Sequence, residues 1–377
     1  MRPIVVITLI TLLVQTVHMG SRVVASLFAI DLGANPLQIG ALISFYSVFP
    51  LLLSIYSGVL SDRLGSYRPM VIGTGVLGLG LATPFVWPHL AALYASAVLI
   101  GIGFIFFNVS AQNLAGSLGA EQERTRNFAT LSLGYGGGHM LGPFIAGVLI
   151  DYQGFSMAYL AFAALAAVPV AMLAANRGLA IAPAPAAAAA KHRNAFSLLK
   201  VAPLRRAIVL SGLVTTGWDL YTFYVPIYGH SIGLSASTIG TVLAAFAVAT
   251  LIVRMALPAL IRRFSVERVL AAAMFAGCAL FVVFPFVSLV PLLLALSFCI
   301  GLALGCSQPL TINLAYNRSP PGRSGEVVGL RLSINNIMHI GVPIAAGAVG
   351  AALGVAPVFW ANAAILAASG RLARSRD

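Results

Sequence analysis

The sequence predicts an all-α integral membrane protein whose twelve transmembrane helices form two pseudo-symmetric six-helix bundles, with both termini in the cytoplasm. Three observations predict this fold: long apolar stretches, positive charge on one side only, and a repeat within the chain. Of the 377 residues, 60% are hydrophobic and 8% are charged, and the mean hydropathy is +0.97. Soluble domains carry about 25% charged residues, so this composition excludes a water-soluble globular protein.

The apolar stretches have the length that a membrane span requires. A helix needs about 20 apolar residues to cross the hydrocarbon core of a bilayer, and stretches of this length recur along the whole chain. We expect spans at residues 4–29, 38–60, 69–88, 91–114, 127–150, 155–176, 206–229, 236–260, 267–288, 291–315, 328–351 and 354–371.

The positive charges predict the orientation of these spans. When both termini are placed inside, lysines and arginines fall at the cytoplasmic ends of the expected helices, and the expected outside loops contain neither residue type. This distribution follows the positive-inside rule, and we expect a multi-pass protein of the plasma (inner) membrane. The net charge of +13 therefore reflects topology. We expect no nucleic-acid partner, because no soluble basic domain is present to bind one.

Residues of the first half recur 200 residues later in the second half, on the same expected elements and in the same order. In a membrane protein, two parallel repeats indicate an alternating-access transporter with its site between the halves. We expect an N-terminal bundle at 1–176, a cytoplasmic linker at 177–203 and a C-terminal bundle at 204–377. The matched pairs include Ile39 and Ile239, Arg63 and Arg263, His139 and His339, and Pro143 and Pro343.

A short segment between the second and third expected helices carries a specific motif. It reads Gly58-Val59-Leu60-Ser61-Asp62-Arg63-Leu64-Gly65-Ser66-Tyr67-Arg68. It resembles the G-x-L-x-D-R-x-G-R-R/K signature of the major facilitator superfamily, although Ser66 and Tyr67 depart from the basic residues of that pattern. The resemblance implies a chain of twelve helices in two six-helix halves, and so covers the full length. It also implies a cytoplasmic latch formed by Gly58, Asp62, Arg63, Gly65 and Arg68.

Each residue of this expected latch has a physical reason. Gly58 would permit close helix packing, and Gly65 would make the turn. Asp62 would meet a helix N-terminus or an arginine of the opposite half.

A second segment, from Gly138 to Gly147, resembles the G-x-x-x-G-P-x-x-G-G stretch of the family's exporters. A glycine-lined helix contact with a proline kink at Pro143 explains it equally well. The arginine that the family's proton antiporters carry in helix 4 is absent, since Ala97 occupies that position.

Charged residues inside the expected spans indicate the functional core. Arg22, Asp219, Arg254 and Arg331 lie within spans, and each ionised group costs about 2.5–3.5 kcal/mol at the centre of a membrane helix. Four such groups imply a water-filled cavity, ion pairs, or both. Arg254 and Arg331 lie toward the cytoplasmic ends of their helices, so we assign them a gating or a structural role.

Polar side chains repeat at helical spacing near these charges. Gln15, His18 and Arg22 share one face of the first span, and Thr215, Asp219 and Thr222 share one face of the seventh. In the resembled family, helices 1, 4, 7 and 10 line the central path. We expect the solute to be contacted by Gln15, His18, Arg22, Asn108, Gln112, Trp218, Tyr221, Gln308, Thr311 and Asn335.

These residues predict a secondary active transporter of a small organic solute. Asp219, together with His18 or His339, is the candidate proton carrier, because imidazoles and buried carboxyl groups exchange protons near neutral pH. Arg22 could hold an anionic group, and the excess of buried arginine over acid favours an anionic or zwitterionic solute. The alternative is a multidrug or metabolite efflux pump that acts as a proton antiporter.

An enzyme is not expected. The sequence contains no phosphate-binding G-x-x-x-x-G-K-[ST] segment, which argues against ATP hydrolysis. It also offers neither a nucleophile with its base nor a metal-ligating cluster. We therefore expect no cofactor and no metal, with a small solute and protons as partners of a monomeric protein.

Overall fold

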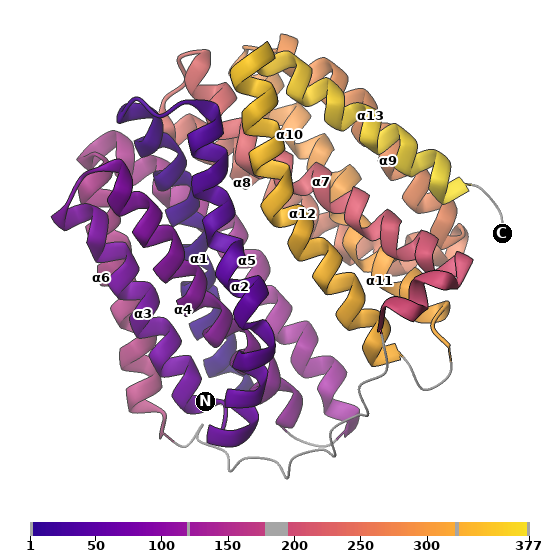
Figure 1. Ribbon diagram of the computed structural model, residues 1–377, viewed down its shortest axis with the longest axis horizontal. Helices are drawn as coiled ribbons and strands as arrows, with labels where there is room; N and C mark the ends of the chain where they lie inside the picture. Colours follow the sequence, from indigo (N-terminus) through magenta and orange to yellow (C-terminus); the bar gives the residue numbers. More distant parts are fainter. Residues whose placement is uncertain (1–2, 119–120, 178–194, 321–323, 375–377) are drawn as a thin grey trace. The chain divides into compact units, whose positions relative to one another are not determined.

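The structure is a computed structural model that describes residues 3–118, 121–177, 195–320 and 324–374 (Figure 1). The described residues form α-helices joined by short turns, and they include no β-strand. The helices of the first half are α1 (Pro3–Asp31), α2 (Pro36–Leu64), α3 (Tyr67–Val86), α4 (Leu90–Ser117), α5 (Glu121–Gln153) and α6 (Phe155–Ala175). The second half contains η2 (Ala195–Lys200), α7 (Ala202–Ser231), α8 (Ala236–Arg263), α9 (Val266–Val283), η3 (Phe284–Phe286), α10 (Val290–Gly305), α11 (Ser307–Asn317), α12 (Ser324–Leu353) and α13 (Val355–Arg374).

Eleven segments within the described residues are long and apolar enough to cross a membrane. The chain is therefore a multi-pass membrane protein. The expected span at 206–229 falls in α7, which has 30 residues but is not among the eleven. The polar residues that α7 carries in its middle lower its hydropathy, and the same residues make it the centre of the candidate site.

The expected span at 291–315 is confirmed as one stretch long enough to cross a membrane, but its helical assignment is interrupted at Cys306, between α10 and α11, where the backbone keeps helical angles (φ −81°, ψ −16°). The cause lies in Pro309, which has no N–H to bond to the carbonyl four residues earlier. That carbonyl, of Gly305, accepts a hydrogen bond from Arg254 Nε of α8 at 3.2 Å. Arg254 thus satisfies the backbone group that the proline leaves open.

The chain divides into two compact units. Unit 1 comprises Met1–Ala34, Leu42–Ala190 and Leu234–Ala244, and unit 2 comprises Asn35–Ala41, Lys191–Gly233 and Ala245–Asp377. In unit 1, α1 packs along α5 and α3 packs along α4. In unit 2, α7 packs along α12, and α13 packs along α9. Most of the expected linker at 177–203 lies outside the described residues, and its last part contains η2.

The turns reproduce the 200-residue repeat. Gly33 and Gly233 both adopt positive φ, at 80° and 77°, and Gly154 and Gly354 do so at 80° and 82°. Positive φ is strained for residues with a Cβ. The two halves therefore turn in the same way at the same places.

Glycines also allow close helix contact within each unit. In unit 1, a methyl group at Gly147 would clash with the carbonyl oxygen of Ala236, and one at Gly240 would clash with that of Pro143. The expected glycine-lined helix contact in α5 is therefore confirmed. In unit 2, Gly40 and Gly347 make the equivalent contacts.

The first turn of α8 has a further partner in unit 1. The carboxylate of Asp151, at the end of α5, accepts hydrogen bonds from the backbone N–H groups of Ala236 at 3.0 Å and Ser237 at 2.8 Å. The first N–H groups of a helix have no partner within the helix. Asp151 therefore acts as the cap of a helix that is distant in sequence.

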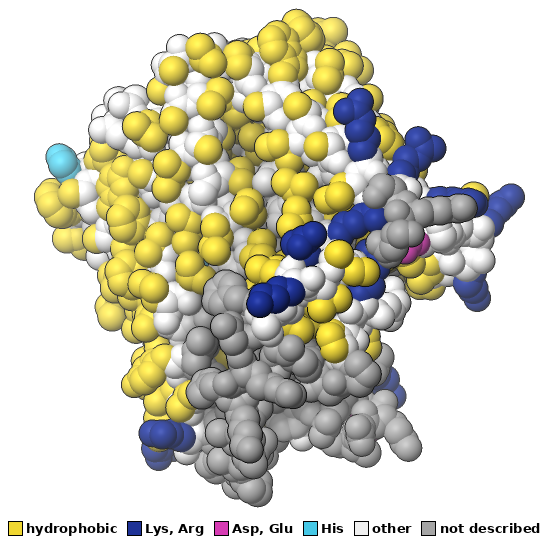
Figure 2. Space-filling model, turned by 45° about the vertical axis from the view of Figure 1, so that its right-hand side comes forward, with side chains coloured by type: hydrophobic (Ala, Val, Ile, Leu, Met, Phe, Trp, Pro, Cys, Tyr) yellow, Lys and Arg dark blue, Asp and Glu magenta, His cyan; other side chains and the backbone are white. Residues whose placement is uncertain are grey.

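Hydrophobic side chains cover most of the face shown in Figure 2, as expected for a protein surrounded by lipid. Lysine and arginine side chains gather in the right-hand and lower parts of that view, and the upper left part shows none.

Candidate functional site

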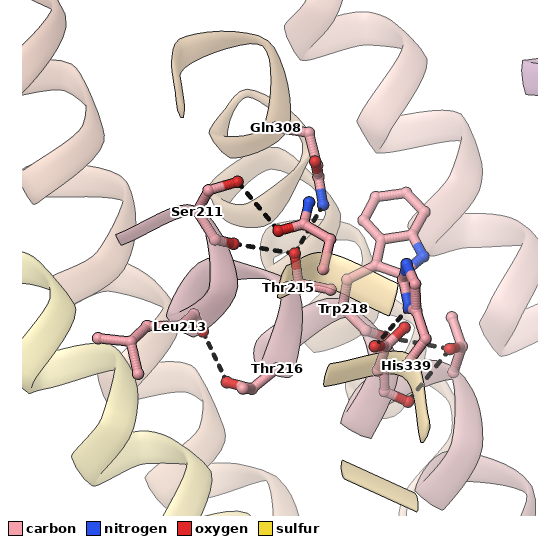
Figure 3. Close-up of polar contacts among 10 residues, drawn as sticks. Ser211, Leu213, Thr215, Thr216, Trp218, Gln308 and His339 are labelled. Carbon is pink, nitrogen blue, oxygen red and sulfur yellow. Dashed lines mark hydrogen bonds and ion pairs between the residues drawn. The ribbon is translucent and has the colours of Figure 1, made fainter. Parts of the chain in front are cut away.

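The facing sides of α7 and α12 in unit 2 carry a polar cluster. Ser211, Thr215 and Asp219 occupy every fourth position of α7, and Arg331, Asn335 and His339 do the same on α12. This spacing keeps the side chains of each helix on one face. We call these six residues the α7–α12 cluster; Figure 3 shows several of its contacts.

The strongest contact of the cluster joins Asp219 and His339. The Nδ1 atom of His339 lies 2.6 Å from Oδ2 of Asp219. The side chain of Asp219 is 4% exposed, whereas that of His339 is 35% exposed. The two residues form an ion pair when His339 is protonated, and the imidazole is the more exposed member of the pair.

Arg331 lies at the other end of the cluster, two helical turns from His339. Its Nη1 donates a hydrogen bond to Ser211 Oγ at 3.0 Å. Asn335 lies 3.2 Å from the same Oγ, and its amide oxygen can accept from Nη1 at 3.3 Å when its nitrogen faces Ser211. That amide orientation satisfies all three groups. Arg331 lies at one end of the membrane span Leu330–Leu353, and its side chain is buried there against Ser211 and Asn335.

Thr215 links the cluster to α11. Gln308 Nε2 donates a hydrogen bond to Thr215 Oγ1 at 3.1 Å, and this contact is drawn in Figure 3. Thr311 is buried, and its hydroxyl donates to the backbone oxygen of Gln308 at 3.0 Å. The expected solute contacts Gln308 and Thr311 therefore lie beside α7, although Thr311 is occupied by its own helix.

Aromatic rings flank Asp219. The ring of Tyr221 stacks on that of Phe246 with centroids 4.3 Å apart, and Trp218 meets the same phenylalanine edge-on at 4.8 Å. The guanidinium carbon of Arg254 lies 5.8 Å from the centroid of the Trp218 ring. Arg254 thus contacts the break between α10 and α11 on one side and this aromatic group on the other.

Unit 1 holds a neutral counterpart of the α7–α12 cluster. Nε2 of Gln15 on α1 lies 3.1 Å from Nε2 of His139 on α5. Gln15 is 3% exposed, and its Oε1 has no hydrogen-bond partner. His139, the repeat partner of His339, therefore meets an amide in unit 1 where His339 meets a carboxylate in unit 2.

His18 and Arg22 lie on the same side of α1 as Gln15. The His18 ring is buried against Phe104, with centroids 3.9 Å apart, and its Nδ1 atom has no hydrogen-bond partner. The guanidinium of Arg22 lies 5.9 Å from the centre of the Tyr46 ring. These two expected site residues thus form part of one cluster in unit 1.

The remaining expected residues of unit 1 lie on α4. Asn108 Oδ1 accepts hydrogen bonds from the Tyr135 hydroxyl and from Gln112 Nε2, the latter at 2.9 Å. Gln112 is exposed. The side chains of Asn108 and Gln112 lie on one face of α4. The hydrogen bond from Tyr135 connects that face to α5.

The motif between α2 and α3 is only partly described. Gly65 adopts a φ of 76°, which confirms that it makes the turn. No described atom lies within 4 Å of a Cβ built at Gly58, so the close helix packing expected there is wrong, because this face of α2 is open. Arg63 and Arg68 are exposed, and the side chain of Asp62 lies outside the described part.

Sequence reasoning missed Ser211, which contacts Arg331 and stands beside Asn335. The signal was present: Ser211 precedes Thr215 by four residues and Asp219 by eight. It also missed the aromatic and phenolic neighbours of unit 1, Tyr46, Phe104 and Tyr135, because contacts between helices cannot be read from the spacing within one helix.

Among the described residues, no group of three or more His, Cys, Asp or Glu side chains is placed to hold a metal ion. The polar groups described above are instead spread along membrane-spanning helices in both units.

The sequence matches the Major Facilitator Superfamily over residues 7–340, and again over residues 208–374. The chain belongs to this superfamily. The second match covers one sequence half by itself, in agreement with the internal repeat, and the family that the Gly58–Arg68 segment indicated is thereby confirmed.

The curated relatives of this superfamily member match only part of the chain. The multidrug resistance protein MdtH of Cronobacter sakazakii is 33% identical over 128 residues, which are 33% of this chain and 31% of the relative. The vesicular acetylcholine transporter of Rattus norvegicus is 26% identical over 133 residues, 35% of this chain and 25% of the relative. The chain is thus aligned to about a third or less of the length of these relatives.

Solved structures match nearly the full chain. The nucleoside transporter NupG superposes with a TM-score of 0.80 at 14% identity and covers 100% of both chains. A POT family transporter in complex with a thioalcohol-conjugated peptide superposes with a TM-score of 0.83 at 12% identity, over 98% of this chain and 94% of that one. At these identities the likeness establishes the fold of a major facilitator transporter.

Proposed function

We propose that this chain is a proton-coupled secondary active transporter that moves a small organic solute, anionic or zwitterionic, across the plasma membrane by alternating access. In this proposal the two units move relative to each other, and an existing proton gradient supplies the energy. The chain acts as a monomer and carries out no chemical reaction on the solute.

One observation carries the proposal: the contact of 2.6 Å between Asp219 and His339. Ionisable residues inside membrane helices are costly and are most often part of ion or substrate pathways. In this proposal the buried carboxylate and the partly exposed imidazole take up a proton on one side of the transport cycle and release it on the other.

The polar residues around this pair support a solute site on the same helices. Gln308 and Asn335 offer amide groups, and Trp218 and Tyr221 offer aromatic surface. In unit 1, we propose that Gln15, His18 and Arg22 also contact the solute. We propose gating roles for the Gly58–Arg68 segment, Arg254 and Arg331.

Reconstituted protein tests this proposal. Purified full chain is first screened by thermal shift against small organic acids, sugars and common drugs, because a ligand of the native state stabilises it. Hits are then followed in proteoliposomes with and without an imposed pH gradient. We expect accumulation only with the gradient, and equal accumulation without any gradient would contradict proton coupling.

A second candidate is export of lipophilic or cationic compounds. The similarity to a multidrug resistance protein and the stacked rings of Tyr221 and Phe246 favour it. Asp219 would then serve as the counter-ion of a cationic compound. Expression in an efflux-deficient host separates the two: raised drug tolerance supports export, whereas unchanged tolerance together with binding of acids supports the first proposal.

A further inference from the structure

Arg331 is a buried cation whose partners among the described residues are neutral. The residue is 5% exposed, and its Nε has no hydrogen-bond partner. Its Nη1 donates a hydrogen bond to Ser211 Oγ at 3.0 Å. Nη1 can also donate to the amide oxygen of Asn335 when the amide nitrogen faces Ser211. Within the described residues, no carboxylate forms an ion pair with it.

The other charged side chains that lie inside the expected spans of unit 2, buried Asp219 and exposed Arg254, have partners. Asp219 is paired with His339. Arg254 donates to the Gly305 carbonyl and lies over the Trp218 ring. Arg331 therefore stands apart as a desolvated positive charge with an unused donor.

This position is charged in one repeat only. Leu131, the residue 200 positions before Arg331, is buried in unit 1 at 1% exposure. The equivalent helix position of the first repeat therefore accommodates an apolar side chain, so packing does not require an arginine at position 331. An uncompensated buried charge is strongly destabilising, so a charge kept at such a position indicates a partner of opposite sign.

We propose that Arg331, with Ser211 and Asn335, forms a binding site for the oxyanion group of a small solute, either a carboxylate or a phosphate. A guanidinium presents donors in a planar fork that matches both groups. In this site the unpartnered Nε, together with Nη2 on the same side of the guanidinium, would hold the oxyanion, while Ser211 and Asn335 hold the guanidinium in place through Nη1. This inference rests on the proposed anionic solute. It assigns Arg331, in place of Arg22, as the residue that binds the acidic group of the solute.

The relation to Asp219 and His339 follows from helix geometry. Arg331 and His339 are eight residues apart on α12, a rise of about 12 Å. The anion site and the proton-exchanging pair thus belong to one cluster without sharing an atom, so each can be removed while the other remains.

Thermal shift of the purified full chain tests the site directly. The probes are inorganic phosphate, acetate and a short-chain phosphatidylglycerol, each compared with chloride at equal ionic strength. We expect phosphate or acetate to raise the unfolding temperature of the wild type in a saturable manner. We expect Arg331→Met to weaken the apparent affinity by about 10- to 100-fold, as expected for the loss of charge-assisted hydrogen bonds.

Further variants keep the test decisive if Arg331→Met does not fold. Ser211→Ala retains the positive charge of Arg331 and should weaken anion binding less than Arg331→Met. Arg331→Lys keeps a positive charge but loses the planar fork of the guanidinium, so its anion affinity should lie between those of the wild type and Arg331→Met. Arg205→Gln, which removes an exposed arginine of α7 outside the cluster, should match the wild type. Glu326→Gln, which removes the acidic residue nearest to Arg331 in the sequence, should also match it.

Several results would overturn the site. One is an equal rise in unfolding temperature with chloride, and another is an unchanged anion affinity in Ser211→Ala and Arg331→Lys. A third is a response to phosphatidylglycerol alone. The last is a marked gain of anion affinity in Glu326→Gln, which would identify an internal carboxylate as the partner of Arg331. Because the measurement needs no transport, anion binding without transport would refute the proposed function and leave the site intact. Transport of an acid with unaltered binding by the Arg331 variants would refute the site alone.

Discussion

The imidazole of His339 lies 2.6 Å from the carboxylate of Asp219, and no other histidine and acid pair in the described part of the chain forms such a contact. In the first repeat, the equivalent histidine, His139, lies 3.1 Å from the neutral amide of Gln15. Met19 occupies the position that corresponds to Asp219. Equivalent helices of the two repeats therefore carry a histidine and carboxylate pair in unit 2 and a histidine and amide pair in unit 1.

The charged pair should have a large coupling energy. Removal of one partner of a buried ion pair costs about 3–5 kcal/mol because the other charge stays buried. We expect His339→Gln to lower the free energy of unfolding by this order, and Asp219→Asn to offset part of the loss in the double variant. A double-mutant cycle measured by thermal or denaturant unfolding gives the coupling.

The Gln15 and His139 pair is the control for that cycle. Its coupling should be about 0.5–1.5 kcal/mol, as for a neutral hydrogen bond. A coupling in unit 2 no larger than this would show that Asp219 and His339 do not form an ion pair.

Arg254 and Pro309 should be energetically linked. Arg254→Ala leaves the Gly305 carbonyl without its side-chain donor, which costs about 1–3 kcal/mol when the group is buried. In the Pro309→Ala background, the new N–H of residue 309 can bond to that carbonyl, so the same substitution should cost less. The unfolding midpoints of the two single variants and of the double variant give the energetic coupling between Arg254 and Pro309. Strict additivity would contradict the helix-break explanation.

Asp151 should stabilise the start of α8. Its two hydrogen bonds to backbone N–H groups resemble those of a helix cap, and loss of a cap costs about 0.5–2 kcal/mol. We expect Asp151→Ala to lower the unfolding temperature and to speed hydrogen exchange in residues 236–240. Asp31→Ala, at the exposed end of α1, is the control and should have little effect on either measurement.

The close helix contacts should tolerate no methyl group. Gly147→Ala brings a Cβ against the carbonyl oxygen of Ala236, and overpacking of this kind typically costs about 1–3 kcal/mol. Gly75→Ala in α3 meets open space and should be neutral or stabilising by up to about 1 kcal/mol, since alanine favours helices. Equal effects of the two substitutions on thermal unfolding would refute the packing argument.

Much of the fold could be predicted from the sequence, because apolar length and charge placement act on each helix separately. The expected spans fall on the observed helices, and the turn at Gly65 follows from its backbone freedom. The break at Cys306 could not be predicted from hydropathy, since α10 and α11 together form one apolar stretch. It depends on Pro309 and on a hydrogen bond from Arg254, which is distant in sequence.

The candidate site was predicted less completely. Helical spacing identified Asp219 and His339 as candidates, but their pairing depends on how α7 packs along α12, and sequence alone does not define that register. Ser211 was missed although it continues the four-residue spacing of Thr215 and Asp219, because its contact with Arg331 depends on the packing of α7 along α12. Gly58 was assigned to close packing from its type, whereas the observed helix face there is open.

The most direct test of the account compares two transport modes of Asp219→Asn in proteoliposomes: accumulation driven by a pH gradient, and exchange of labelled for unlabelled solute without a gradient. Proton coupling through Asp219 predicts that accumulation is lost while exchange persists, because exchange needs no net proton movement. Asp31→Asn, the control, should keep both modes. Gradient-driven accumulation by Asp219→Asn at the wild-type level would contradict the central claim.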